Sequence, residues 1–231
     1  MPARQLTFDL AHRPSLSGED FLIAPANVQA ITWIDTWPNW PSQVMAISGP
    51  AQSGKTHLAH VFMAMSNAHL IDAADINQDM ARNLVEGNSA LVIDNADSIA
   101  GSAREEVLFH ILNMLKETGH HAVLCSRNPP ARWGASLPDL QSRLNALLHV
   151  AIEDPDESLL AAVMVKQFTD RQLRLDSAAI DYILPRMERS FNFVNEIVSA
   201  IDNLALREQR KITIPLIKQA METLQHNDME T

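Results

Sequence analysis

The chain has 231 residues, of which 46% are hydrophobic, and it carries a formal net charge of −10. This length and apolar share allow one sizeable core, or a domain with a smaller appended unit. The basic residues form no stripe of the kind that neutralises a phosphate backbone, so strong direct binding to DNA is disfavoured.

The sequence also argues against secretion, membrane insertion and a structural metal. The single cysteine, Cys125, lies in the apolar run HAVLCS and has no disulfide partner in the chain, which favours a reducing compartment. The start MPARQLTFDL has no apolar leader, and no stretch approaches the roughly 18 apolar residues of a membrane span. The nine histidines lack cysteine partners or HExxH spacing. We expect a cytoplasmic protein.

The first patterned segment, QLTFDL at residues 5–10, precedes anything that looks like a fold. It fits either an early strand packed against the core or an exposed docking segment, and we assign residues 1–20 to a flexible tail.

Five apolar runs bounded by turn signals then predict strands. They are VMAIS (44–48), HLI (69–71), ALVI (90–93), HAVLC (121–125) and LLHVAI (147–152). Segments with helical spacing lie between them, the clearest over residues 107–115 and closed by Gly119. This alternation predicts an α/β base domain over residues 21–153, with a five-stranded parallel sheet.

After residue 153 the strand signals disappear. The segment EDPDES opens a helical stretch, and the last helix is predicted at TIPLIKQAM, with Thr213 as its cap and Pro215 in its first turn. We therefore expect a small all-α lid domain over residues 154–231.

The segment GPAQSGKT matches the phosphate-binding pattern GxxxxGK[ST] between a predicted strand and a predicted helix. Gly49 and Gly54 permit the tight backbone path, Lys55 is expected to reach the β- and γ-phosphates, and Thr56 to ligate Mg²⁺. The predicted nucleotide contacts are Gly49, Pro50, Ala51, Gln52, Ser53, Gly54, Lys55, Thr56 and His57.

A second acidic motif, ALVIDNAD, places Asp94 at the end of a strand, where its carboxylate is expected to hold Mg²⁺ through water. Asn95 follows; it can orient water but cannot take its proton, whereas Asp97 is a carboxylate that can compensate. The alternative is that Asn95 simply caps the turn. In either case we expect the chain alone to hydrolyse ATP slowly, and the Asn95→Asp variant to hydrolyse it faster.

Together, FLIAPANVQA, GPAQSGKTHL, LVIDNAD, SRNPPARW and DLQSRLNALLHVAI resemble the AAA+ module of DnaA-related replication proteins. Because it shows neither DnaA's N-terminal domain nor its DNA-binding helix-turn-helix, the chain resembles the shorter Hda type. The resemblance implies a P-loop AAA+ base that binds ATP or ADP with Mg²⁺, and it places the segment from Ala24 to Asn27 beside the adenine.

The resemblance also assigns catalytic and sensing roles. It makes Arg143 an arginine finger for a neighbouring subunit's ATP, although an isolated arginine is more often a solvated surface residue or a carboxylate partner. The family's sensor arginine falls at Asn192 here, with Arg189 one turn earlier, which puts γ-phosphate sensing in doubt. The segment Ser126 to Asn128 is a loose match to the first sensor.

In this family setting, QLTFDL fits the linear motif that docks on the sliding clamp, the β subunit of DNA polymerase III. Gln5 would hydrogen-bond at the rim, while Leu6, Phe8 and Leu10 fill an apolar groove. The implied protein is a clamp-recruited negative regulator that stimulates ATP hydrolysis in DnaA and is itself a weak ATPase at most. A helicase loader or accessory initiation factor, and a metabolic P-loop kinase, are the alternatives; a homo-oligomer is left open.

Overall fold

The computed structural model describes residues 12–13 and 21–228. The predicted clamp motif, Gln5 to Leu10, lies outside these residues. The chain divides into two compact units, His12–Glu153 and, among the described residues, 154–228. Each unit has its own secondary structure and its own buried side chains.

The first unit is built on a five-stranded sheet with the order β4-β5-β6-β3-β7, in which every neighbouring pair is parallel. Its strands are β3 (Val44–Ser48), β4 (His69–Asp72), β5 (Ala90–Asp94), β6 (His121–Ser126) and β7 (Leu148–Ala151). The α/β fold and the parallel five-stranded sheet predicted from the sequence are confirmed.

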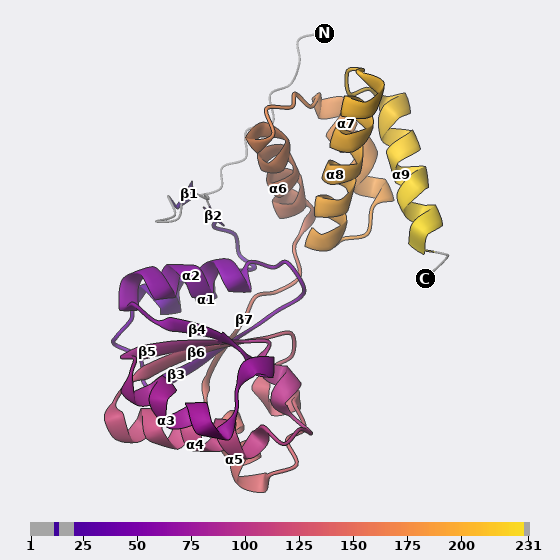
Figure 1. The fold of residues 1–231 in the computed structure, drawn as a ribbon. Helices are drawn as coiled ribbons and strands as arrows, with labels where there is room; N and C mark the ends of the chain where they lie inside the picture. The colour runs from indigo at the N-terminus through magenta and orange to yellow at the C-terminus, as the bar shows by residue number, and fades with distance from the viewer. Residues whose placement is uncertain (1–11, 14–20, 229–231) are drawn as a thin grey trace. The chain divides into compact units, whose positions relative to one another are not determined.

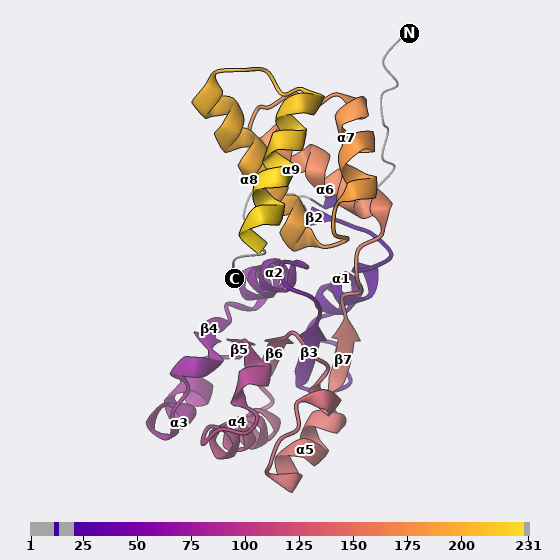
Figure 2. The same ribbon diagram turned by 90° about the vertical axis from the view of Figure 1, so that its right-hand side faces the viewer.

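Helices cover both faces of this sheet (Figures 1 and 2). Those on one face are α1 (Val28–Asp35) and α2 (Lys55–Ser66), and those on the other are α3 (Gln78–Glu86), α4 (Glu105–Thr118) and α5 (Pro138–Asn145). Short 3-10 helices join them: η1 (Ala73–Asp75), η2 (Ala96–Ile99) and η3 (Pro130–Arg132). A two-stranded antiparallel ribbon, β1 (His12–Arg13) with β2 (Phe21–Leu22), precedes the sheet.

The strands are apolar on both faces because each face has its own core. Along β3, Val44 and Ala46 belong to the core under α3, α4 and α5, whereas Met45 and Ile47 belong to the core under α1 and α2. Side chains alternate between faces along a strand, so a sheet covered on both sides needs a continuous apolar run. This explains why the sequence shows uninterrupted runs rather than polar and apolar alternation.

The second unit is entirely helical among its described residues. Its elements are α6 (Glu157–Asp170), α7 (Ser177–Ile183), η4 (Leu184–Arg186), α8 (Phe191–Glu208) and α9 (Ile214–Asp228). Asp156 caps α6 by accepting the Leu159 amide at 2.7 Å, and Ser190 caps α8 in the same way. Thr213, the predicted cap, directly precedes α9.

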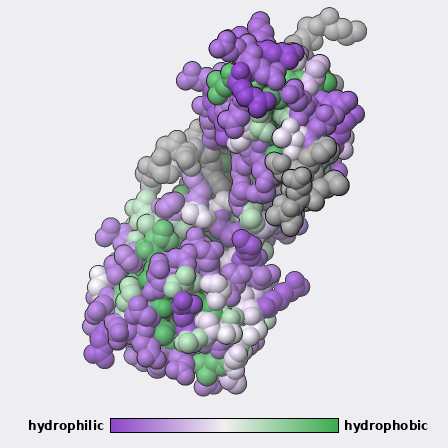
Figure 3. Space-filling view, turned by 45° about the vertical axis from the view of Figure 1, so that its right-hand side comes forward, coloured by the Kyte–Doolittle hydropathy of each residue, from purple (hydrophilic) through white to green (hydrophobic). Residues whose placement is uncertain are grey.

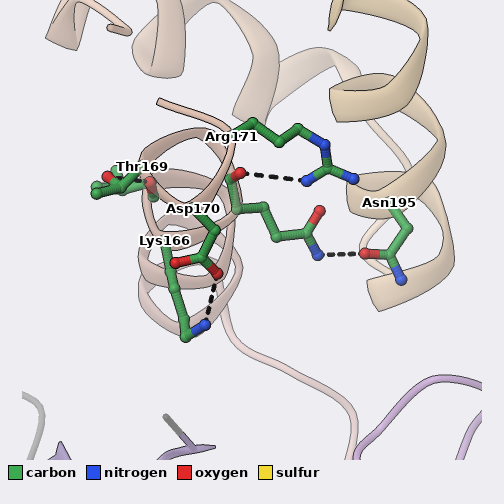
Figure 4. Close-up of polar contacts among 7 residues, drawn as sticks. Lys166, Thr169, Asp170, Arg171 and Asn195 are labelled. Atoms are coloured by element: carbon green, nitrogen blue, oxygen red, sulfur yellow. Dashed lines mark hydrogen bonds and ion pairs between the residues drawn. The ribbon is translucent and has the colours of Figure 1, made fainter. Parts of the chain in front are cut away.

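Polar contacts join α6 to α8 in this unit (Figure 4). The Gln167 amide donates to Asn195 Oδ1, and Arg171 extends from the end of α6 to Asp202, with 3.6 Å between Nε and Oδ2. Lys166 pairs with Asp170 one turn along α6 at 2.6 Å. The apolar faces of both helices are buried.

The surface of both units is mostly hydrophilic in the view of Figure 3. The large apolar side chains exposed among the described residues are Val28, Leu70, Leu206 and Ile214. No helix in the described part of the chain combines the length and the apolar character needed to cross a bilayer.

Candidate functional site

The loop Gly49–Gly54 joins the end of β3 to the start of α2, as the GxxxxGK[ST] pattern predicts. A Cβ at position 49 would lie 2.9 Å from Ile152 O and from Ser53 Oγ, so only glycine fits there without a shift. Gly54 has φ 96°, in the left-handed region, and no side chain caps the helix that follows. The first amides of α2 are therefore left for an acceptor from outside the helix.

Two polar side chains at the start of α2 and just before it, Lys55 and Ser53, differ in their hydrogen bonding. Lys55 Nζ donates to Gly49 O at 2.9 Å and to Pro50 O at 2.6 Å. Burial lowers the pKa of Lys55, although Cys125 and Asp94 oppose that shift. Ser53 is 4% exposed, and its Oγ has no hydrogen-bond partner among the described residues. A buried hydroxyl without a partner is costly, and an oxygen-rich ligand would satisfy it.

The ends of β4 and β5 bring two carboxylates to one edge of the sheet. Asp72 and Asp94 are register partners in this parallel pair. Asn95 follows Asp94 in the left-handed conformation, with φ 52°, and its backbone amide donates to Asp94 Oδ1 at 2.9 Å. Its side-chain Nδ2 donates to Asp72 Oδ2 at 2.6 Å. The side chain of Asn95 thus binds across the strands, and makes no capping hydrogen bond to η2.

Asp97, the residue expected to compensate for Asn95, is bound to the predicted first sensor. Its Oδ2 accepts hydrogen bonds from the backbone amides of Arg127 and Asn128, at 3.1 and 3.3 Å, and from Asn128 Nδ2 at 3.4 Å. Ser126 is also engaged, since its hydroxyl donates to Asn128 O at 2.8 Å. The structure therefore gives Asp97 the role of fixing the loop after β6.

The segment from Ala24 to Asn27 is a closed loop ahead of α1. Asn27 is buried, with Oδ1 accepting the Ala24 amide at 2.9 Å and Nδ2 donating to Leu22 O at 2.8 Å. Ala26 O accepts the Glu153 amide at 2.9 Å, which ties the loop to the end of β7. These bonds hold the Asn27 side chain between the loop and β2.

Arg143 lies in the last turn of α5, and α5 precedes β7. Its guanidinium carbon is 5.1 Å from the centre of the Phe109 ring, on α4, in a cation–π contact. No ion pair joins it to a carboxylate within the described part of the chain. Arg189, in contrast, pairs with Glu157 inside the second unit, and Asn192 donates to Glu196 at 2.6 Å.

Both units of the chain are similar to known proteins. Residues 156–221 match the family model "Hda, lid domain". The chain is 24% identical to the chromosomal replication initiator protein DnaA of Thermomicrobium roseum, over 93% of this chain and 50% of that protein, so it spans half the length of this relative. The chain thus carries an Hda-type lid at residues 156–221 and is similar over most of its length to DnaA.

Solved structures of DnaA show the same fold as this chain. Domain III of DnaA from Thermotoga maritima superposes with a TM-score of 0.75 at 18% identity, covering 88% of this chain and 94% of that one. AMPPCP-bound DnaA from Aquifex aeolicus superposes with a TM-score of 0.67 at 22% identity, covering 82% and 65%. The helical unit that carries α6 to α9 is therefore the AAA+ lid, and the sheet unit is the AAA+ base.

Sequence reasoning missed Asp72 in this AAA+ base. The signal was present, because Asp72 ends the run HLID just as Asp94 ends ALVID, and the carboxyl ends of neighbouring parallel strands meet at one edge. It also missed Glu105, which is 4% exposed and accepts the backbone amides of Gly101, Ser136 and Leu137. These bonds fix the loop that begins α5.

Proposed function

We propose that this chain binds ATP or ADP at residues 49–57 and stimulates hydrolysis of ATP held by DnaA, to which it presents Arg143. Nucleotide binding is supported by the strand, glycine loop and open helix N-terminus, and by the unpartnered Ser53 hydroxyl. The Lys55 ammonium would exchange the carbonyls of Gly49 and Pro50 for phosphate oxygens. Thr56 and Asp94 would hold Mg²⁺ together with the phosphates.

We expect the chain to hydrolyse its own nucleotide slowly. The position after Asp94 is an amide, which is a poor proton acceptor, and Oδ2 of the nearby Asp97 accepts three hydrogen bonds from residues 127 and 128. A general base contributes typically about 10²–10⁴-fold to a rate. Without one, the nucleotide in this chain would act chiefly as a bound ligand.

The position of Arg143 is the observation that supports action in trans. The phosphate-binding loop follows β3, whereas α5 precedes β7, and these two strands pair in parallel with Met45 opposite Leu148. The two sites therefore lie toward opposite edges of the sheet. A five-residue strand spans roughly 16 Å, more than one arginine side chain covers. Arg143 is thus better placed to serve the nucleotide of a second molecule than its own.

An arginine at that place would act on charge that develops during hydrolysis. Guanidinium presents several donors in one plane and pairs with phosphate oxygens of a transferring γ-phosphoryl group. Because Arg143 has no carboxylate partner among the described residues, its charge is available to an approaching phosphate. DnaA is the proposed target because the base and lid both resemble DnaA-related proteins.

Recruitment to the sliding clamp is proposed from the sequence of the tail. In QLTFDL, Gln5 would hydrogen-bond at the rim of the clamp pocket, and Leu6, Phe8 and Leu10 would fill it. Replacing Gln5 and Phe8 with alanine should abolish binding to the clamp and leave nucleotide affinity unchanged. Alanine at Thr7 and Asp9 is the matched control, because these residues alternate with the proposed contacts. Loss of thermal stability on deleting residues 1–12 would instead favour a tail packed against the fold.

One experiment tests the central proposal. DnaA loaded with radiolabelled ATP is incubated with clamp on DNA, with and without this protein, and conversion to ADP is followed. We expect faster conversion only when protein and DNA-loaded clamp are both present. Equal rates in all mixtures would contradict the proposal and favour a helicase loader or another accessory initiation factor.

A further inference from the structure

Asp72 is a carboxylate at the candidate site to which the proposed function gives no role. It ends β4, beside the end of β5, and both of its oxygens accept hydrogen bonds. Oδ1 accepts the Ala74 amide at 2.8 Å, and Oδ2 accepts Asn95 Nδ2 at 2.6 Å. The second bond joins residues 23 positions apart in sequence, so it depends on the pairing of the two strands.

The hydrogen bond between Asp72 and Asn95 fixes the orientation of the Asn95 side-chain amide. An ionised carboxylate accepts hydrogen bonds and donates none, so Asp72 selects the NH₂ end of its neighbour. The backbone of Asn95 supports the same arrangement, because the left-handed conformation with φ 52° suits asparagine and its amide is bound to Asp94. The oxygen Oδ1 of Asn95 is consequently directed away from Asp72.

We propose that Asp72 is a positioning residue for Asn95, and that the Asp72–Asn95 pair, not Asn95 alone, keeps nucleotide hydrolysis in this chain slow. The inference rests on the proposed nucleotide binding. Asn95 offers an oxygen that can orient water but cannot accept its proton. An aspartate at position 95 would face the Asp72 carboxylate across a hydrogen-bond distance, where two acceptors and two like charges repel each other.

This inference changes the expectation drawn from the sequence. The motif ALVIDNAD alone predicts that Asn95→Asp suffices to raise turnover. With Asp72 beside it, the single substitution should leave turnover within about twofold of the wild type. The double substitution Asp72→Asn/Asn95→Asp keeps one donor and one acceptor but reverses their order, and should raise turnover by about 10- to 10²-fold, the lower part of the range for a general base.

The test compares four proteins: the wild type, Asp72→Asn, Asn95→Asp and the double variant. ATP turnover at saturating ATP is measured for each, together with ADP affinity. The midpoint of thermal unfolding is measured without nucleotide. Asparagine also caps helices well, so Asp72→Asn should keep the cap of η1. The matched control is Asp75→Asn, because Asp75 lies exposed in the same short helix and should change neither turnover nor the midpoint.

We expect the two single substitutions to lower the unfolding midpoint and the double variant to recover most of the loss. Additive losses would overturn the pairing, and equal turnover in Asn95→Asp and in the double variant would overturn its effect on hydrolysis. If the wild type binds no nucleotide, the proposed function fails. The unfolding measurements still decide the pairing, because they are made without nucleotide.

Discussion

Charged side chains at the two edges of the parallel sheet differ in the partners that they bind. At the carboxyl edge, Lys55 donates to two backbone carbonyls, Asp72 accepts from an amide side chain, and Asp97 accepts from three groups. Toward the other edge, Arg143 rests on the Phe109 ring without a described carboxylate partner. At the carboxyl edge these charged side chains are hydrogen-bonded within the chain. At the other edge the Arg143 guanidinium has no such bond described and is free to pair with a phosphate.

The difference between the two edges matters because each cation must lose its present contacts before it can bind a phosphate. A cation–π contact stabilises by about 0.5–2 kcal/mol, depending on its exposure, and Arg143 gives up this one contact when it moves into a phosphate site. Hydrogen bonds to a charged group contribute about 1.5–3 kcal/mol each. Lys55 must exchange two such bonds for phosphate contacts. Arg189 belongs with the held groups, since Glu157 pairs with it in the lid, and it would have to leave that partner before sensing a phosphate.

The largest effect expected at the Arg143 edge is on hydrolysis in the partner. Arg143→Ala should lose most of the stimulation of ATP hydrolysis by DnaA, because an arginine finger contributes roughly 10³–10⁵ in rate. Arg143→Lys should rescue poorly, since ammonium lacks the planar set of donors. The measurement is DnaA-bound ATP turnover with DNA-loaded clamp.

The control for this substitution is Lys116→Ala, because Lys116 is an exposed cation on α4, the helix that α5 packs against. It should stimulate DnaA as the wild type does. The nucleotide affinity of Arg143→Ala itself should be unchanged, since its own binding loop lies toward the other edge. If Arg143→Ala stimulates DnaA as fully as the wild type does, Arg143 is not the arginine finger, and the difference between the two edges has no consequence for hydrolysis.

A second prediction tests the carboxyl edge. Lys55→Ala should weaken ADP binding by about 10²-fold or more, because it removes the cation that would face the phosphates and each charge-assisted bond is worth roughly 1.5–3 kcal/mol. Fluorescence titration with a labelled ADP measures the affinity, and Lys116→Ala again supplies the control for lost charge. An unchanged affinity would show that the loop Gly49–Gly54 is not the nucleotide site.

The fold was predictable because its signals are local. Apolar runs such as VMAIS and ALVI coincide with β3 and with all but the last residue of β5, since a strand buried on both faces must be apolar throughout. The binding loop and Asp94 were equally readable, because each adjoins its own strand in sequence. The separation of Arg143 from that loop also follows from chain order. The loop follows β3, whereas α5 precedes β7, the parallel neighbour of β3.

The pairing of Asp72 with Asn95 was not predictable in the same way. It joins two strands whose adjacency depends on the sheet order, and it needs the left-handed backbone of Asn95 to aim the amide. The hydrogen bonds of Asp97 have a similar cause, because their donors lie after β6, 30 and 31 residues further along the chain. Such contacts are set by tertiary structure, and no local pattern reports them.

The smallest expected effect concerns Glu105, whose bonds fix the loop from which α5 leads to Arg143. Burial opposes ionisation of Glu105, but the amides of Ser136, Gly101 and Leu137 outweigh it and hold the pKa of the carboxyl below its ordinary value of 4.5. Glu105→Gln should lower the free energy of unfolding by about 1–3 kcal/mol at pH 7, because one of these buried amides then loses its acceptor or faces a donor. Urea unfolding measures the difference.

The pH dependence of that difference has a definite sign. A depressed carboxyl pKa stabilises the fold above the unfolded value and ceases to do so as the pH falls through the folded value. The gap between wild type and Glu105→Gln should therefore be full at pH 7 and narrow below about 4.5. Glu106→Gln is the matched control, because Glu106 is the exposed neighbour in the same first turn of α4 and loses the same helix-dipole interaction. If both variants lose equal stability at pH 7, the three buried hydrogen bonds contribute nothing beyond that interaction, and another contact must hold the start of α5.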